Sequence, residues 1–276
     1  MSAVTPAARV PHLDYEGRVT FPRVVLSEWT KFRSVRSTAW SLGVGILLTI
    51  LFPVLFSFVT SSHWGTMSPQ DRANRHPLDI ALAGVNVAQL AIAVLGVLMI
   101  SAEYSTGSIR STLTAVPKRL PVLWAKLLDY AAVSIVVMIP AVLISFFASQ
   151  AILSKHDILQ VSFTAPGIAR CVLCGALYVT MVGIFALALG AIVRNTAGGI
   201  ALFAGIFFVL PPLMFTLPQS WNNAISQYLP SEAGRQIFSL QHGAHTLRPL
   251  TGGLVFAAYC AAAIVIAAYL LRRRDV

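Results

Sequence analysis

Charged residues are scarce in this chain, and long stretches have none. Only 11% of its 276 residues are Asp, Glu, Lys or Arg, and 57% are hydrophobic, whereas soluble domains average about 25% charged and about 45–50% apolar residues. A helix needs roughly 20 predominantly apolar residues to cross a bilayer. Six stretches without any charged residue are long enough: Ser37–Gln70, Ile80–Ala102, Tyr130–Ser154, Cys171–Val193, Asn195–Ser231 and Pro249–Leu271. The sequence therefore predicts an integral membrane protein.

Other absences exclude whole classes of chemistry. The three cysteines, Cys171, Cys174 and Cys260, lie inside predicted spans, which excludes a disulfide framework. The chain has no G-x-S-x-G, no H-E-x-x-H and no Gly-Lys pair, so it carries no Walker-type nucleotide site. His242 and His245 have no Cys or carboxylate near them in sequence, so we expect no metal site. We predict that the chain is not an enzyme and holds no cofactor of its own.

The uncharged stretches predict an all-α, polytopic fold with six transmembrane helices. Charged side chains at a helix centre cost about 2.5–3.5 kcal/mol each, so the spans should avoid them. After the fifth span, the amphipathic segment 220–240 is interrupted by Pro230 and predicts short helices at the outer leaflet. Residues 1–20 are expected to be a flexible cytoplasmic N-terminus, and 21–276 a single transmembrane domain. The expected spans are about 38–60, 80–102, 128–152, 170–193, 197–217 and 250–271.

An amphipathic, basic segment precedes the first span. On a helix over 21–36, one side carries Phe21, Val25, Trp29 and Phe32, and the opposite side is polar. This pattern is typical of a helix that lies in the headgroup layer and contacts membrane lipids.

The basic residues are distributed unevenly among the connecting segments. Six precede the first span and four lie in the loop 101–126, but the first loop has only Arg72 and Arg75. Because cytoplasmic segments carry an excess of Lys and Arg, both termini are predicted to be cytoplasmic. The net charge of +10 then reflects topology, and we expect no nucleic-acid partner.

The loop 101–126 is the most specific segment. It reads E-Y-x-x-G-S-I-R-x-x-L-x-x-x-P-x-R, and Glu103 through Thr114 is expected to form a short helix. It resembles the loop between the second and third spans of type-2 permeases of ATP-binding-cassette (ABC) exporters. E-W-T-K-F-R before the first span and L-P-S-E-A-G before the sixth also resemble that family, with Glu232 replacing the commoner Asn. The matching loop residues are Glu103, Gly107, Arg110, Leu113, Pro117, Arg119 and Lys126.

The resemblance implies a permease subunit in a bacterial plasma membrane. In that family two six-span chains pair, as a homodimer or heterodimer, and two separate cytoplasmic ATPase subunits bind ATP and Mg. The residues that would couple to the ATPase are Glu103, Tyr104, Gly107, Arg110 and Leu113. Those at the cytoplasmic interface would be Glu28, Trp29, Lys31 and Arg33.

Polar and aromatic residues inside the spans suggest a substrate path. Asn86 and Gln89 either line that path or hydrogen-bond neighbouring helices. Phe203 and Phe207 either gate an apolar cavity or face lipid. An uncharged path suits a hydrophobic or amphipathic cargo.

There are three rival functions, and the sequence shows none of the features that the first two predict. An ATP-independent secondary carrier predicts ionisable groups within the membrane, but Asp79, Glu103 and Asp129 lie at predicted span ends, so we expect no buried carboxylate suited to a proton relay. A membrane-embedded enzyme predicts a nucleophile–base pair or metal cluster. A non-transporting sensor or scaffold fits the same sequence.

Overall fold

The computed structural model describes residues 20–115, 119–156, 160–240, 243 and 245–273, and these contain helices and no strands. The expected flexible N-terminus at 1–20 falls outside this part except for Thr20. The α-helices are α1 (Phe21–Ser34), α2 (Arg36–His63), α3 (Pro69–Ala73), α4 (Pro77–Ser105), α5 (Ser108–Ala115), α6 (Leu120–Leu153), α7 (Ile168–Val193), α8 (Thr196–Ala204), α9 (Leu210–Met214), α10 (Gln219–Ile225), α11 (Pro230–Arg235) and α12 (Pro249–Arg273). Short 3₁₀ turns are η1 (Trp64–Thr66), η2 (Ser154–His156), η4 (Ser226–Tyr228) and η5 (Gln236–Phe238), and η3 (Gly205–Val209) is a π-helical turn.

Within the described residues, six helical segments are long and apolar enough to cross a membrane. Each corresponds to one expected span, so the prediction of an all-α multi-pass membrane protein is confirmed. Most helices extend a few residues past the expected limits. The largest difference is α6, which begins at Leu120 rather than near 128. The short helices expected before the sixth span are α10 and α11.

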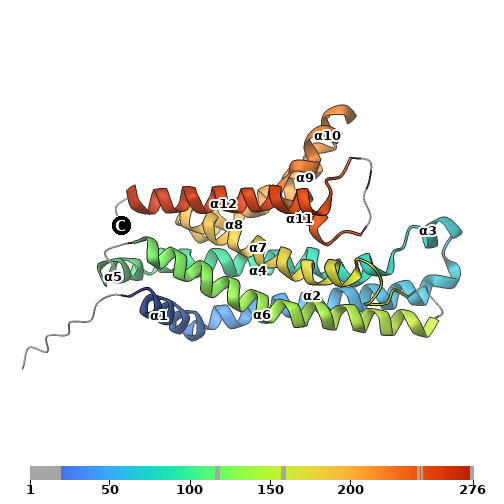
Figure 1. Cartoon of the computed structure of the whole chain (residues 1–276), viewed down its shortest axis with the longest axis horizontal. Coiled ribbons are helices and arrows are strands. Elements are labelled where there is room, and N and C mark those ends of the chain that lie inside the picture. Colours follow the sequence, from blue (N-terminus) through green and yellow to red (C-terminus); the bar gives the residue numbers. More distant parts are fainter. Residues whose placement is uncertain (1–19, 116–118, 157–159, 241–242, 244, 274–276) are drawn as a thin grey trace, which may run out of the picture.

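Helices α4 and α7 form the centre of the bundle. Helix α4 packs against α2, α6, α7 and α8, and α7 packs against α4, α6, α8 and α12. In Figure 1 the long helices run side by side, with α12 and α8 on one side of the central pair and α2 and α6 on the other. The most hydrophobic window of α7 is 72% buried, against 17% for the fifth span. Most of the fifth span's surface is therefore left for lipid or another chain.

The contact between α4 and α7 depends on small residues. A methyl group on Gly96 would collide with the carbonyl oxygen of Gly183. On its other side Gly183 faces the ring of Tyr130, whose hydroxyl donates a hydrogen bond to the Ile92 carbonyl at 2.7 Å. Glycine allows backbones to approach closely where the surrounding lipid provides no hydrophobic driving force for association. These contacts join α4, α6 and α7.

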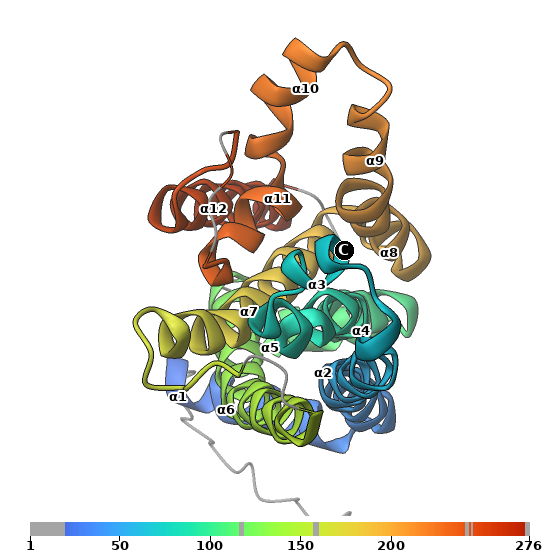
Figure 2. The same cartoon turned by 90° about the vertical axis from the view of Figure 1, so that its right-hand side faces the viewer.

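The fifth span ends earlier than expected, at Met214 instead of near Leu217. Pro211 and Pro212 supply no backbone N–H, and the helix widens to the π turn η3 just before them. Beyond this turn, α9 and α10 lead away from the bundle (Figure 2).

The buried side of helix α1 overlaps the predicted apolar side only at Phe32, and Phe21 and Trp29 stay available to lipid. Val24, Glu28 and Phe32 are buried, whereas Phe21 is 46% exposed and Trp29 39%. Val24 packs against Val122 and Ala125 of α6. The side that faces α6 thus includes a carboxylate, which apolar periodicity alone could not identify.

Gly96→Ala tests the close approach of α4 and α7. Because the added methyl meets backbone, we expect the free energy of unfolding to fall by about 1–3 kcal/mol, measured by thermal denaturation in detergent. Gly43→Ala is the matched control, since a methyl group there has no atom within 4 Å. Equal melting temperatures for the two variants would contradict this account of the contact.

Candidate functional site

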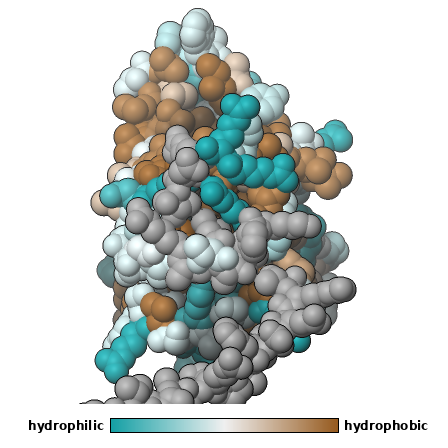
Figure 3. All heavy atoms as spheres, turned by 90° about the vertical axis from the view of Figure 1, so that its left-hand side faces the viewer, coloured by the Kyte–Doolittle hydropathy of each residue, from teal (hydrophilic) through white to brown (hydrophobic). Residues whose placement is uncertain are grey.

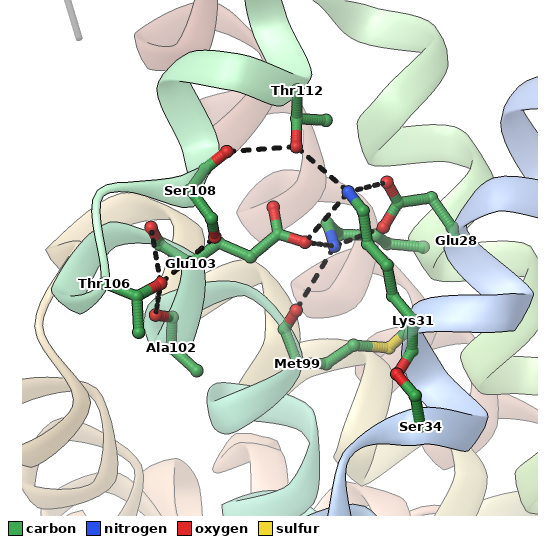
Figure 4. Close-up of polar contacts among 10 residues, drawn as sticks. Glu28, Lys31, Ser34, Met99, Ala102, Glu103, Thr106, Ser108 and Thr112 are labelled. Atoms are coloured by element: carbon green, nitrogen blue, oxygen red, sulfur yellow. Dashed lines mark hydrogen bonds and ion pairs between the residues drawn. The ribbon is translucent and has the colours of Figure 1, made fainter.

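Four charged side chains from three helices meet at one end of the bundle (Figure 4). Glu28 and Lys31 come from α1, Glu103 from the last turn of α4, and Lys126 from the second turn of α6. We call these four residues the charge cluster. They consist of two lysines and two glutamates, so their formal charges cancel.

Lys126 lies at the centre of the charge cluster. Its side chain is 2% exposed, and its Nζ donates to Glu28 Oε2, to Glu103 Oε1 at 2.8 Å and to the Met99 carbonyl at 3.4 Å. All three ammonium protons thus have an acceptor. A buried charge needs such neutralisation, since the penalty for taking an ion out of water is several kcal/mol.

Lys31 bridges the same two glutamates from the other side. Its Nζ lies 2.7 Å from Glu28 Oε1 and 3.3 Å from Glu103 Oε1, and it donates to Thr112 Oγ1 of α5 at 3.0 Å. These contacts connect α1 to the end of α4 and to α5.

The two glutamates keep Lys31 protonated. Burial lowers the pKa of Lys31, but Glu28 and Glu103 raise it more, so the pKa lies above the ordinary value of 10.5. A raised lysine pKa stabilises the fold below pH 10.5, and that contribution is lost as the pH rises through the folded-state pKa. Lys31 therefore stays protonated throughout the neutral range.

The expected helix from Glu103 through Thr114 is divided in two, which corrects the prediction. Helix α4 continues to Ser105, and α5 begins at Ser108. Gly107 lies between them with φ +72°, a conformation that glycine adopts without strain. Glu103 and Tyr104 thus belong to the fourth helix, and only the residues after Gly107 belong to α5.

Further contacts link this end of α4 to the remaining spans. The Arg194 guanidinium lies 5.1 Å from the centre of the Tyr104 ring and donates to the Leu270 carbonyl at 3.4 Å. The hydroxyls of Ser101 and Thr196 lie 2.8 Å apart. Together these contacts connect α4 to the start of α8 and to the last turn of α12.

The remaining residues predicted to contact a partner are partly or fully exposed where the structure describes their side chains. Trp29 is partly exposed and stacks on Phe32 with ring centres 6.3 Å apart, and Arg33 is exposed. The side chains of Arg110 and Leu113 lie outside the described part, although their backbone is in α5. In Figure 3, which faces this end of the bundle, hydrophilic side chains gather near the middle of the surface.

The two polar residues of the second span have separate environments. Gln89 is buried and accepts a hydrogen bond from the Tyr178 hydroxyl at 2.6 Å, so it joins α4 to α7. Asn86 lines a hollow at the other end of α4, and its Oδ1 is buried with no hydrogen-bond partner among the described residues.

The predicted gate residues lie in the packed interior. Phe203 and Phe207 are 1% and 3% exposed, and their rings stack with centres 4.4 Å apart. Phe207 also contacts the rings of Phe185 in α7 and Phe256 in α12. This aromatic group holds the fifth span against the rest of the bundle.

Asp129 is buried, contrary to the expectation for a span end. It is 5% exposed, and its Oδ2 has no hydrogen-bond partner among the described residues. The difference arises because α6 begins at Leu120, which places Asp129 more than two turns inside the helix. In the described part of the chain, no three His, Cys, Asp or Glu side chains are grouped so as to hold a metal ion.

The ion pairs of the charge cluster were not expected from the sequence. A signal was present, because Glu28 lies four residues from both Val24 and Phe32 and so shares a helix face with them. An acidic residue on an apolar face requires a cation opposite, and Lys126 is the first basic residue within the third span.

Comparison with known proteins gives no family assignment. No protein-family model matches the chain, and no curated protein matches it. The resemblance found in the loop 101–126 therefore stays a prediction.

Lys126→Met tests the charge cluster. Removing the central ammonium leaves two acidic groups with Lys31 as their one ion-pair partner in the charge cluster. We expect the unfolding free energy to fall by about 3 kcal/mol, the lower end of the cost of breaking a buried ion pair. Arg33→Met removes an exposed charge at the same end of the bundle. It should change the unfolding free energy by no more than about 0.5 kcal/mol. Thermal unfolding of both variants in detergent is the measurement, and equal stability would refute the structural role of the charge cluster. Adding Glu28→Gln to Lys126→Met should restore part of the loss.

Proposed function

We propose that the chain is the transmembrane permease subunit of an ABC-type exporter, moved by separate cytoplasmic ATPase subunits. The observation that carries the proposal is the attachment of α5. This short helix lies at the end of the bundle between two long spans, and Lys31 ties it to α1 through Thr112. A partner that contacts α5 would act on several helices at once.

The contacts around α5 form a mechanical connection. The ion pair between Glu103 and Lys126 joins α4 to α6 at the two ends of the loop that contains α5. Arg119, also in that loop, donates to the Leu271 carbonyl of α12 at 3.2 Å. Packed elements move as bodies rather than deforming continuously, so a displacement of α5 would tilt these spans together.

A second permease chain completes the proposed transporter. Ala197 and Ala201 are exposed on α8, and a methyl group on Gly205 would meet no atom within 4 Å. Within one chain this small-residue surface is therefore unused. It supports close packing between two chains, which would enclose a path for a hydrophobic or amphipathic substrate.

We place the chain in a bacterial plasma membrane with both termini in the cytoplasm. The basic residues support this orientation: α1 and the loop around α5, where they are concentrated, lie at the same end of the bundle (Figure 1). ATP and Mg would then be bound by the partner subunits on that side.

A proton-coupled secondary carrier is the second candidate, and the burial of Asp129 favours it. A buried carboxylate with an oxygen that has no hydrogen-bond partner among the described residues is the kind of group that such carriers use. Glu28 and Lys126 both act on it electrostatically. This candidate predicts that no ATPase accompanies the chain and that a proton gradient alone drives transport.

Purification of the tagged chain from its native membrane tests the proposal. A nucleotide-binding subunit should co-purify, and Arg110→Glu combined with Leu113→Asp should reduce its yield about tenfold or more, because a charge reversal and a new buried charge oppose docking. Arg248→Glu, an exposed reversal at the opposite end, is the control and should retain the subunit. Full yield after replacement of residues 106–119 by a Gly/Ser linker would disprove coupling through α5.

The orientation predicts which introduced cysteines react. Ser108→Cys, on the exposed start of α5, should be protected from a membrane-impermeant maleimide in intact cells and react after lysis. Trp221→Cys, on the exposed surface of α10, should react in intact cells. Both are compared with the parent chain, whose own cysteines are buried or half-buried. The reverse result would place α5 outside and end the proposal.

A further inference from the structure

A polar hollow opens at the end of α4 opposite the charge cluster. It has a volume of about 540 Å³ and is lined by α2, α4, α11 and the residues that follow α11. Asp79 and Asn86 line it from α4, and Glu232 and Arg235 from α11, while Phe56 of α2 contributes an apolar wall. Asp79 and Glu103 are separated along α4 by about 36 Å. The two polar regions therefore lie at opposite ends of the bundle.

One of the two carboxylates that line this hollow forms no ion pair with a described residue. Arg235 lies 3.5 Å from Glu232 and forms an ion pair with it. Asp79 makes no hydrogen bond or ion pair through its carboxylate with any residue that the structure describes, although His76 and Arg235 act on it electrostatically. Glu232 thus takes the one guanidinium that lines this hollow at ion-pair distance. Asp79, which also lines an adjoining hollow with Arg75 and His76, makes no ion pair with either and stays available to a cationic ligand.

Asp79 and Asn86, the two polar residues of α4 that line the hollow, both present hydrogen-bond acceptors to it. The Asn86 carbonyl oxygen is buried and has no donor among the described residues. It lies seven positions after Asp79, about two turns and about 10 Å farther along the same face. Ala83 and Phe56 line the hollow with them. A complementary ligand therefore carries a donor at each end and an apolar chain between them.

We propose that this hollow binds an amphipathic amine. Its ammonium group pairs with Asp79, its hydrocarbon chain lies along Ala83 and Phe56, and a second donor such as a hydroxyl reaches Asn86. A zwitterionic lipid headgroup fits less well, because its phosphate adds negative charge beside Asp79 and Glu232. The site belongs to the single chain and does not depend on an ATPase partner.

Binding of 8-amino-1-octanol to the full chain tests the site. The chain is placed in phosphatidylcholine nanodiscs at pH 7 and titrated by calorimetry, and empty nanodiscs provide the correction for partition into lipid. Octanoate is the matched anionic probe. We expect the amine to bind about tenfold or more tightly than octanoate. Equal affinities would overturn the proposal without the use of any variant.

Variants locate the ammonium group. Asp79→Asn should weaken amine binding about tenfold or more, the range of a charge-assisted hydrogen bond, and Asp79→Glu should preserve most of it. Asp71→Asn is the control, since Asp71 is exposed on α3 at the same end and does not line the hollow. Wild-type affinity in a folded Asp79→Asn variant would refute the assignment.

Asn86→Leu tests the second donor. It should reduce the affinity for 8-amino-1-octanol about two- to tenfold, the value of a neutral hydrogen bond, and leave octylamine binding unchanged. An equal loss for both amines would refute the role of Asn86. Addition of phosphatidylethanolamine to the nanodiscs should not displace the probe, and displacement would mean that a lipid headgroup is the true occupant. Because no ATPase is present, failure here is separate from failure of the proposed transport function.

Discussion

Neutralisation of buried charge at one end of the bundle is the interaction on which the rest depends. Lys126 is nearly inaccessible to solvent. Its burial is tolerable only because Glu28 and Glu103 accept hydrogen bonds from its ammonium group and neutralise its charge. Each glutamate comes from a different helix. The energetic requirement to pair these charges therefore determines where α1 lies, how far α4 extends, and where α5 begins.

The packed interior connects this end of the bundle to the opposite end. The glycine contact between α4 and α7 leaves no space for either helix to shift alone, and Tyr130 locks α6 against both. Helix α4 consequently behaves as a rigid rod whose two ends differ. One end carries paired charges linked to a peripheral helix, and the other carries a carboxylate without an ion pair beside a hollow. A transporter moved by a partner on one side needs such a connection between its two faces.

The resemblance of the loop 101–126 to ABC permeases and the physical arrangement of α5 are independent arguments. The first rests on residue order, and the second on contacts between α1, α4, α5 and α6. Neither depends on the identity of a substrate. Burial of Asp129 supports the second candidate, a proton-coupled carrier, because such a carrier would use a buried carboxylate.

Hydropathy and backbone preference act locally, so the sequence was enough to predict the six spans and the short helices before the sixth. It did not predict the helix break at Gly107. It could not determine which face of α1 is buried, or that Gln89 bonds to Tyr178 while Asn86 faces a hollow. Nor did it show that Phe203 and Phe207 lie inside the bundle. Only the tertiary structure decided these points, because each depends on side chains that are distant in the sequence and meet when the helices pack.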